Sequence, residues 1–289
     1  MHGFLNIDKP AGLTSHDVVA RVRRITRQRR VGHAGTLDPA ATGVLVVALG
    51  QATRLIEYVQ DQTSKRYLAT VRLGLTTDTD DAEGTTLAES PVPDLERAEL
   101  ERVLAPFRGE ILQVPPMYAA LHHEGRRLHE LARAGITVER PARPVTIERL
   151  DLLGWEPPLL QLDVLCGKGT YIRSLARDIG ETLGCGAHLA ALRRTAVGTF
   201  TADSATPLAE LEREGVLALT PPEHAVADWQ AVDLDEDGAR RIRNGQPIAL
   251  PEVETQRLRA HGAGGTLLAL LVRDGHSYKP VKVFDWTAP

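Results

Sequence analysis

Residues 32–43 read GHAGTLDPAATG and place three glycines, a histidine, two threonines and the carboxylate of Asp38 in one short stretch. An arginine-rich segment precedes it and the apolar run 44–49 follows it, which indicates a loop leading into a buried strand. Glycine permits a positive φ and a close approach of the backbone, and a following proline restricts Asp38 to extended or turn geometry. A lone Asp-Pro step is usually an ordinary turn. In this setting we expect the Asp38 carboxylate to be held in one pose.

The composition is that of a folded protein with one large and one small domain. The chain has 289 residues, of which 43% are hydrophobic, enough for a sizeable core. No apolar run is as long as a membrane span, and the N-terminal residues lack the basic and then apolar order of a signal peptide. We therefore expect a soluble, cytoplasmic protein. Cys166 and Cys185 are too few for a disulfide framework or a zinc site, so we expect two buried thiols.

The net charge of −4 argues against a nucleic-acid partner only if the sum is considered. Phosphates are bound by local clusters of cations, and such clusters occur here, whereas the negative charge is concentrated between Asp78 and Glu101. An exposed run of charge is usually a solvated surface, so no cluster identifies a site by itself. The basic clusters are Arg21, Arg23, Arg24, Arg27, Arg29 and Arg30; Arg126 and Arg127; Arg140 and Arg143; Arg193 and Arg194; and Arg240, Arg241 and Arg243.

Local patterns around the central stretch predict strands and helices in alternation. Residues 4–7 are typical of a short strand, and 8–12 of the turn after it. Ser15 is a candidate N-cap for a helix over 16–28, which would bury its valines and expose its arginines. After the interior strand, residues 51–60 have helical periodicity.

Residues 65–73 alternate as a strand with one buried face does. Tyr67 is on that face, where most tyrosines belong to the core. The acidic stretch 76–84 lacks the glycine and glutamate positions of an EF-hand, so we interpret it as a solvated loop. Asp94 is a candidate cap for the helix that follows.

The clearest helical periodicity lies at residues 172–183, after an alternating strand over 160–166. The Lys-Gly-Thr step before this helix lacks the full P-loop pattern, and we interpret Thr170 as its N-cap. Tyr171 and Arg173 would then lie in the first turn, at the sheet edge where active-site groups collect.

Between Pro115 and Pro144 the chain is basic and irregular, with a helical piece around 125–134. Three histidines occur in it without a cysteine or carboxylate at a recognisable ligand spacing, so we expect RNA contact or plain surface and no metal site. They are His122, His123 and His129.

Three motifs make the sequence resemble the TruB-type pseudouridine synthases, which isomerise uridine 55 in the T-loop of transfer RNA. The central stretch matches His-x-Gly-Thr-Leu-Asp-Pro-x-Ala-Thr-Gly and departs from the family pattern only at Ala34 and Ala40, where Thr and Leu are common. The other motifs are Gly-Thr-Tyr-Ile-Arg-Ser at 169–174 and Ala-His-Leu-x-x-Leu-Arg-Arg at 187–194. The resemblance is strong over residues 4–200 and looser beyond them.

The resemblance implies an α+β pseudouridine synthase fold with a mixed, mostly antiparallel central sheet, plus a small C-terminal PUA-like β-barrel. The implied domains are a catalytic domain over 1–222, with a thumb-like insertion at about 113–146, and an RNA-binding domain over 228–289. The local patterns agree with this division: the prolines at 221–222 begin a linker, and short apolar runs separated by turns follow it.

The resemblance also implies the roles of individual residues. Asp38 is the implied catalytic carboxylate, Arg173 pairs with it, and Tyr67 stacks on the target uracil. His33 would occupy or brace the base stack that the uridine leaves. The implied catalytic residues are Asp38, Arg173 and Tyr67, and the implied substrate-binding residues are His33, Tyr67, Tyr171, Leu192 and Lys9.

The implied reaction breaks and re-forms the glycosidic bond. Asp38 would either attack the sugar or base, or remove a sugar proton, and the residues do not choose between these routes. An adjacent arginine would favour the ionised carboxylate. We expect no metal and no organic cofactor, the T-arm of transfer RNA as partner, no membrane association, and a monomer.

Two other functions are compatible with the residues. A non-catalytic transfer RNA folding chaperone or RNA-binding scaffold would use the arginine clusters and aromatic side chains without needing Asp38. A synthase guided by a partner RNA is the other alternative, and the compact chain without a long basic tail disfavours it.

Overall fold

The computed structural model describes residues 1–61, 63–119, 122–123, 126–127, 135–136, 138–216 and 218–287, with only the backbone at 122–123 and 126–127. The helical piece expected around 125–134 therefore lies outside the described residues, apart from two residues that form a strand. His129 also lies outside them, as does much of the expected insertion.

The described helices lie in both halves of the chain. The α-helices are α1 (Ser15–Thr26), α2 (Ile56–Asp61), α3 (Arg97–Leu104), α5 (Ile172–Thr182), α6 (Leu208–Glu214) and α7 (Glu236–Arg243). The 3-10 helices are η1 (Gly50–Leu55), η2 (Ala105–Phe107), η3 (Ala202–Ser204), η4 (Pro222–Val226) and η5 (Ala263–Gly265).

Most of the strands belong to one large sheet. Its members are β1 (Gly3–Lys9), β2 (Val31–His33), β3 (Thr42–Leu49), β4 (Lys65–Leu73), β7 (Gly109–Gln113), β10 (Arg143–Glu156), β11 (Leu159–Cys166), β12 (Ala187–Val197), β13 (Phe200–Thr201) and β14 (Thr206–Pro207). The smaller sheets contain β5 (Leu75–Thr77), β6 (Thr86–Glu89), β8 (His122–His123), β9 (Arg126–Arg127), β15 (Gln230–Asp233), β16 (Arg257–His261), β17 (Leu267–Asp274) and β18 (Ser277–Val283).

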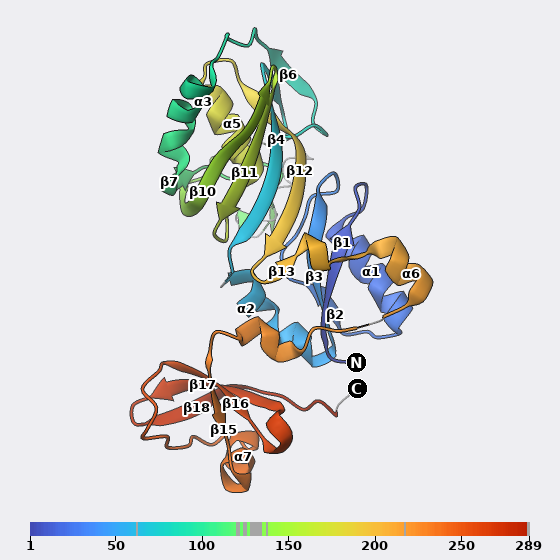
Figure 1. Cartoon of the computed structure of the whole chain (residues 1–289), viewed down its shortest axis with the longest axis vertical. Helices are drawn as coiled ribbons and strands as arrows, with labels where there is room; N and C mark the ends of the chain where they lie inside the picture. The colour runs from blue at the N-terminus through green and yellow to red at the C-terminus, as the bar shows by residue number, and fades with distance from the viewer. Residues whose placement is uncertain are drawn as a thin grey trace.

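The large sheet has the order β14-β1-β3-β12-β4-β11-β10-β7, with β2 added to β3 and β13 to β12. The β1/β14 and β3/β12 pairs are parallel and the other pairs are antiparallel. The expected mixed, mostly antiparallel sheet is therefore confirmed. Its two halves meet at the β3/β12 pair, where only Thr42 with Arg193 and Gly43 with Arg194 are in register. Figure 1 shows the long upper half and the lower half that this short pairing joins.

Strand β3 is the interior strand predicted from the apolar run. Residues Val44 to Leu49 are all fully buried, because the strand lies between β1 and β12 and is covered on both faces. One face belongs to the main core, which α1, α3, α5 and α6 complete. The other face packs with η1, α2 and residues of the C-terminal module. The loop before β3 thus emerges from the best-packed part of the molecule.

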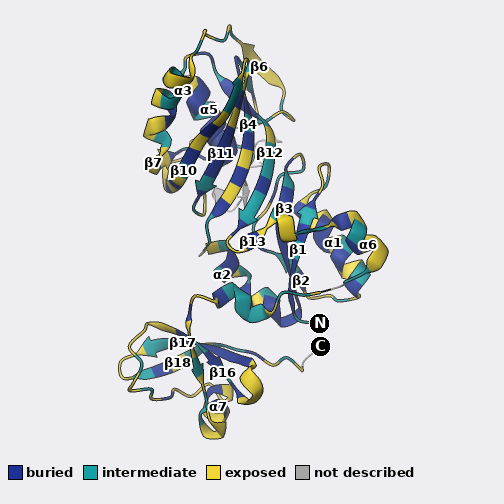
Figure 2. Ribbon diagram, in the orientation of Figure 1, coloured by how far each residue is buried: buried dark blue, intermediate teal, exposed yellow. Residues whose placement is uncertain are grey.

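The alternation predicted for β4 is also confirmed. Tyr67, Ala69, Val71 and Leu73 are buried, and the residues between them are exposed or half-buried. Figure 2 shows these alternating bands along the strand. The buried face of β4 is directed at the helices, so Tyr67 points toward the same side of the sheet as α5.

Three predicted helix caps are wrong by one or two positions. Thr14, not Ser15, caps α1, in a capping box with Asp17. Glu96, not Asp94, caps α3, and the N-cap residue of α5 is Tyr171, not Thr170. In each case a neighbouring residue also has a suitable side chain, and the tertiary path of the chain decides which one is used.

The C-terminal module is a four-stranded sheet with the order β15-β16-β17-β18, and α7 packs on its own small core. The expected barrel is not closed by the described strands, because β15 and β18 lie at opposite ends of the sheet and do not pair. The module contacts the catalytic part through stacking of Tyr58 against Trp229 and through the ion pair of Lys282 with Glu57. Among the described residues, no helix is long and apolar enough to cross a membrane.

Candidate active site

The loop that carries Asp38 joins β2 to β3 and is tied to neighbouring segments. The Ser15 hydroxyl donates to the Leu37 carbonyl at 3.1 Å and accepts from the Leu37 amide at 2.9 Å. The Gly12 amide donates to the Pro39 carbonyl at 2.9 Å. Because Ser15 begins α1, the helix and the turn before it hold the loop on both sides of Asp38.

Lys9 lies behind this loop and is fully buried. Its ammonium group donates to the carbonyls of Pro10, Leu13 and Pro39 at 2.9, 2.6 and 3.1 Å. Burial lowers the pKa of Lys9, and the nearby Asp38 carboxylate opposes that effect. An ammonium group whose three N–H bonds are already used has none left for a ligand. The structure therefore gives Lys9 a loop-positioning role in place of the expected contact with substrate.

Asp38 forms an ion pair with Arg173 in the first turn of α5. Arg173 Nε lies 3.1 Å from Asp38 Oδ2, and the Asp38 side chain is 39% exposed whereas that of Arg173 is 7% exposed. The other edge of the guanidinium donates to the carbonyls of Thr79 and Tyr118 at 3.2 and 2.9 Å. The arginine is thus fixed from behind, and the carboxylate in front of it remains open to solvent.

The pKa of Asp38 is raised above its ordinary value, chiefly by burial. Arg173 acts in the opposite direction, as expected, and so do Lys9 and Arg194, while the Asp81 carboxylate raises the pKa further. The expectation that the arginine alone sets the protonation of Asp38 is therefore incomplete. Removal of water from the carboxylate outweighs the attraction of the cations around it.

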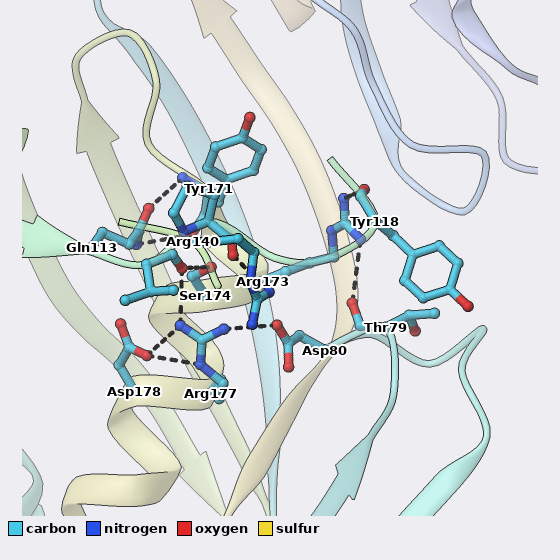
Figure 3. Close-up of polar contacts among 12 residues, drawn as sticks. Thr79, Asp80, Gln113, Tyr118, Arg140, Tyr171, Arg173, Ser174, Arg177 and Asp178 are labelled. Carbon is cyan, nitrogen blue, oxygen red and sulfur yellow. Dashed lines mark hydrogen bonds and ion pairs between the residues drawn. The ribbon is translucent and has the colours of Figure 1, made fainter. Parts of the chain in front are cut away.

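The acidic stretch interpreted as a solvated loop is part of this site. Asp81 Oδ2 lies 3.5 Å from Arg173 NH1, and Asp80 Oδ2 lies 3.0 Å from Arg177 NH1. Their side chains are only 15% and 16% exposed. Figure 3 shows Arg173 and Arg177, one helical turn apart on α5, reaching toward the loop at Thr79 and Asp80. The acidic run alone did not reveal its partners, which lie on a helix far along the chain.

Tyr171 is held at the start of α5 by Gln113, a residue that the sequence reasoning missed. The Gln113 amide accepts from the Tyr171 N–H at 2.8 Å and donates to its carbonyl at 3.1 Å. Gln113 is 1% exposed, so this pair of bonds is shielded from water. Burial raises the pKa of the half-buried Tyr171, and the charges of Arg173 and Asp38 both act on its hydroxyl. Tyr171 therefore lies beside the ion pair.

Tyr67 and Leu192 are neighbours on adjacent strands. In the β4/β12 register Tyr67 is opposite Arg194, and Leu192 is opposite Ala69. Residues two positions apart point to the same face, so the half-buried Leu192 is a diagonal neighbour of Tyr67. Burial raises the pKa of Tyr67, and Asp38 adds to this effect.

His33 ends β2, beside the start of α1. Its ring lies edge-on to that of His16, with centroids 5.3 Å apart. Burial lowers the pKa of His33, and His16 and Arg194 lower it further, which favours the neutral ring. His33 is thus half-buried next to the loop, on the side of α1. Among the described residues, no group of three or more His, Cys, Asp or Glu side chains could hold a metal ion.

Three family models match nearly the whole chain. Residues 23–172 match the N-terminal domain of the TruB family pseudouridylate synthases. Residues 173–226 match the C-terminal domain of tRNA pseudouridylate synthase B, and 229–285 match the C-terminal domain of tRNA pseudouridine synthase II.

Curated relatives and solved structures agree with these matches. A tRNA pseudouridine synthase B of Gloeobacter violaceus is 51% identical over 255 residues, which is 86% of this chain and 87% of the relative. Another, of Dehalococcoides mccartyi, is 46% identical over 297 residues, covering 100% of this chain and 98% of the relative. A chain of a crystal structure of a Cbf5-Nop10-Gar1 complex is 28% identical with a TM-score of 0.75, covering 98% of this chain and 85% of that one. The chain therefore belongs to the TruB family of pseudouridylate synthases.

Proposed function

We propose that the chain isomerises uridine 55 in the T-loop of transfer RNA to pseudouridine, with Asp38 as the reacting carboxylate. Relatives at 46–51% identity are named tRNA pseudouridine synthase B, which supports transfer RNA as the substrate. The observation that carries the role of Asp38 is its pairing with a buried arginine while 39% of its own side chain stays exposed. Such a carboxylate is oriented and can still reach a ligand.

The residues around Asp38 suit a uridine that has left the base stack. Extrusion of a base costs a few kcal/mol, which stacking and polar contacts in a pocket offset. We propose that Tyr67 stacks on the uracil, and that Leu192 and Tyr171 line the pocket. His33, at the edge of the loop, would brace the stack that the base leaves.

The isomerisation breaks the bond between N1 and the sugar C1′ and forms a bond between C5 and C1′. The electron pair of the broken bond stays on the uracil, which turns so that C5 faces the sugar, and the proton on C5 leaves to solvent after the new bond forms. Asp38 starts this sequence, either by attack on the sugar or base or by removing a sugar proton. Arg173 keeps the carboxylate aligned during both bond changes. No step requires a cofactor.

The remaining expectations stay predictions that follow from the same proposal. They are recognition of the T-arm, a monomeric state and a cytoplasmic location. The division into a catalytic domain over 1–222, a thumb-like insertion at about 113–146 and an RNA-binding domain over 228–289 is also a proposal.

The test is tritium release from a T-arm RNA labelled at uridine C5, because the proton on C5 is lost in the proposed reaction. The intact protein should release tritium, and Asp38→Asn should release none while it still binds the RNA. Release by the variant would remove Asp38 from the chemistry. Tight binding without release by either protein would favour the chaperone or scaffold. Release that required an added guide RNA would favour the guided synthase.

A further inference from the structure

Arg194 is a buried cation whose hydrogen bonds go to the backbone around the Asp38 loop. Its side chain is among the largest fully buried ones and is 1% exposed. Nε donates to the Val44 carbonyl at 2.7 Å, NH2 to the Gly35 carbonyl at 3.0 Å, and NH1 to the Thr36 carbonyl at 3.3 Å. The guanidinium thus joins β3 to the loop residues just before Asp38.

Its neighbour Arg193 has a different environment on the same strand. Arg193 is partly exposed and forms a bidentate ion pair with Asp8, at 3.0 and 2.8 Å. Arg194 forms no ion pair within 4.0 Å with any carboxylate of the described residues. The expected phosphate contact is therefore wrong for Arg194, because RNA cannot reach a buried guanidinium.

A buried charge without a carboxylate in direct contact is costly, and carbonyl dipoles offset only part of the cost. A neutral side chain of similar size could fill this space more cheaply, so the position points to a use for the charge. The Arg194 charge acts on Asp38, His33 and Tyr67, and a hydrogen bond from Arg194 also acts on the Tyr67 hydroxyl. All three residues belong to the proposed site.

The backbone of Arg194 lies at the junction of the two half-sheets. It is in register with Gly43, which has φ +99° and whose missing Cβ would lie 2.1 Å from the Arg194 carbonyl oxygen. The strand that carries Arg194 therefore touches the start of β3, and its side chain turns back under the loop. No other position on β12 combines this close backbone approach with contacts to the loop in the described structure.

We propose that Arg194 is a positioning residue for the proposed isomerisation, which holds the Asp38 loop through the carbonyls of Gly35 and Thr36 and favours the ionised carboxylate by its fixed charge. This inference rests on the proposed function. The other charges that face Asp38 are Arg173 from α5, Lys9 from β1 and Asp81 from the acidic loop. Arg194 differs from Arg173 in that it does not touch the carboxylate and acts through the loop and across space.

The test compares Arg194→Gln, which keeps hydrogen-bond donors but loses the charge, with Arg194→Lys, which keeps the charge but not the forked geometry. Val71→Ala is the control, since it weakens the core on the adjacent strand β4 without touching the loop. Single-turnover tritium release is measured against pH, transfer RNA affinity is measured separately, and hydrogen exchange is followed in the peptide over residues 34–41.

Arg194→Gln should lower the single-turnover rate by about 10- to 100-fold with little change in affinity. Its acid limb should move to higher pH by roughly half a unit or more, because one of the cations that lower the pKa of Asp38 is gone. Arg194→Lys should lose rate but keep the position of the limb. Both variants should exchange faster at residues 34–41 than Val71→Ala does.

Two results would overturn the proposal: an acid limb that stays in place in Arg194→Gln, or exchange at residues 34–41 no faster than in Val71→Ala. If Arg194→Gln does not fold, Arg194→Lys decides: a limb that moves with the charge retained would contradict the electrostatic role. Failure of the wild-type protein to release tritium would refute the proposed function instead. The exchange measurement would still test whether Arg194 holds the loop.

Discussion

Gly43→Ala tests whether the junction between the half-sheets depends on the absence of a side chain. Gly43 has φ +99°, and a Cβ there would lie 2.1 Å from the Arg194 carbonyl oxygen and 2.9 Å from the Arg194 carbonyl carbon and amide nitrogen. All three are backbone atoms of the paired strand, so no side-chain rotation relieves the clash. The β3/β12 pairing must open, and only two residue pairs hold it.

The size of the effect follows from two contributions. A positive φ costs a residue with a Cβ about 1–2 kcal/mol. Opening the junction adds roughly 1 kcal/mol for each lost backbone hydrogen bond, and about 1–3 kcal/mol if a buried donor of Arg194 is left without a partner. We expect Gly43→Ala to lower the free energy of unfolding by about 3–5 kcal/mol in all.

Gly109→Ala is the matched control. Gly109 begins β7 in the same sheet with φ +87°, and nothing lies within 4 Å of a Cβ placed there. It should show only the backbone cost, about 1–2 kcal/mol. Urea unfolding followed by circular dichroism measures both variants, and tritium release should fall further in Gly43→Ala because the Asp38 loop leads into Gly43. Equal shifts of the urea midpoint in the two variants would refute the argument from close approach.

Four further outcomes are expected. Arg173→Lys should lower turnover by about 10- to 100-fold with less than about a threefold change in RNA affinity, since the side chain orients the carboxylate; an equal loss of affinity would contradict this role. Because burial raises the pKa of Asp38, Asp38→Asn should raise the urea midpoint at pH 7 and leave it unchanged below the ordinary pKa of 3.8. The hydrogen bond from Arg66 lowers the pKa of Asp163, so that Asp163 stabilises the fold above its ordinary pKa and this contribution disappears as pH falls through the lowered value. Asp163→Asn should therefore cost roughly 1 kcal/mol at pH 7, a small value because the arginine partners are partly exposed, and a loss that persisted at the lowest pH would have another cause. Neutralising three exposed arginines should flatten the dependence of RNA affinity on salt, by up to about 0.7–0.9 per phosphate contact, whereas Arg102→Gln on α3 should not; the three are Arg27, Arg29 and Arg30.

The choice of these three arginines comes from the structure. The sequence shows six arginines between residues 21 and 30 without distinguishing them. In the fold, Arg21 and Arg24 reach the same Glu212 carboxylate on α6, at 3.1 and 3.6 Å, and Arg23 donates to the Val31 carbonyl. A cation already paired within the protein gains less from a phosphate, so it should contribute less to the salt dependence.

The local patterns predicted much of the fold correctly. The alternation over 65–73, the interior run 44–49 and the helix at 172–183 all appear as expected, because burial on one face imposes a short period on the sequence. The central stretch was also sufficient to indicate the family. These features depend on near neighbours in the chain, and the sequence contains them directly.

Other expectations failed where distant segments decide the environment of a charged side chain. Arg194 and Lys9 look in the sequence like surface cations, yet both are buried, because the strands and the loop bring carbonyl groups to them. Asp81 looks solvated and instead meets Arg173. Gln113 carries no sequence signal beyond its place at the end of a strand.

The sequence by itself determined which residues react and which elements carry them, since motif spacing and periodicity are local properties. Only the tertiary structure decided how the charge of Asp38 is set. The protonation of a carboxylate depends on its burial and on every charge within a few ångströms, and these come from β1, β12, α5 and the acidic loop together. Segments that lie far apart along the chain become neighbours only in the fold, and no local pattern records that approach.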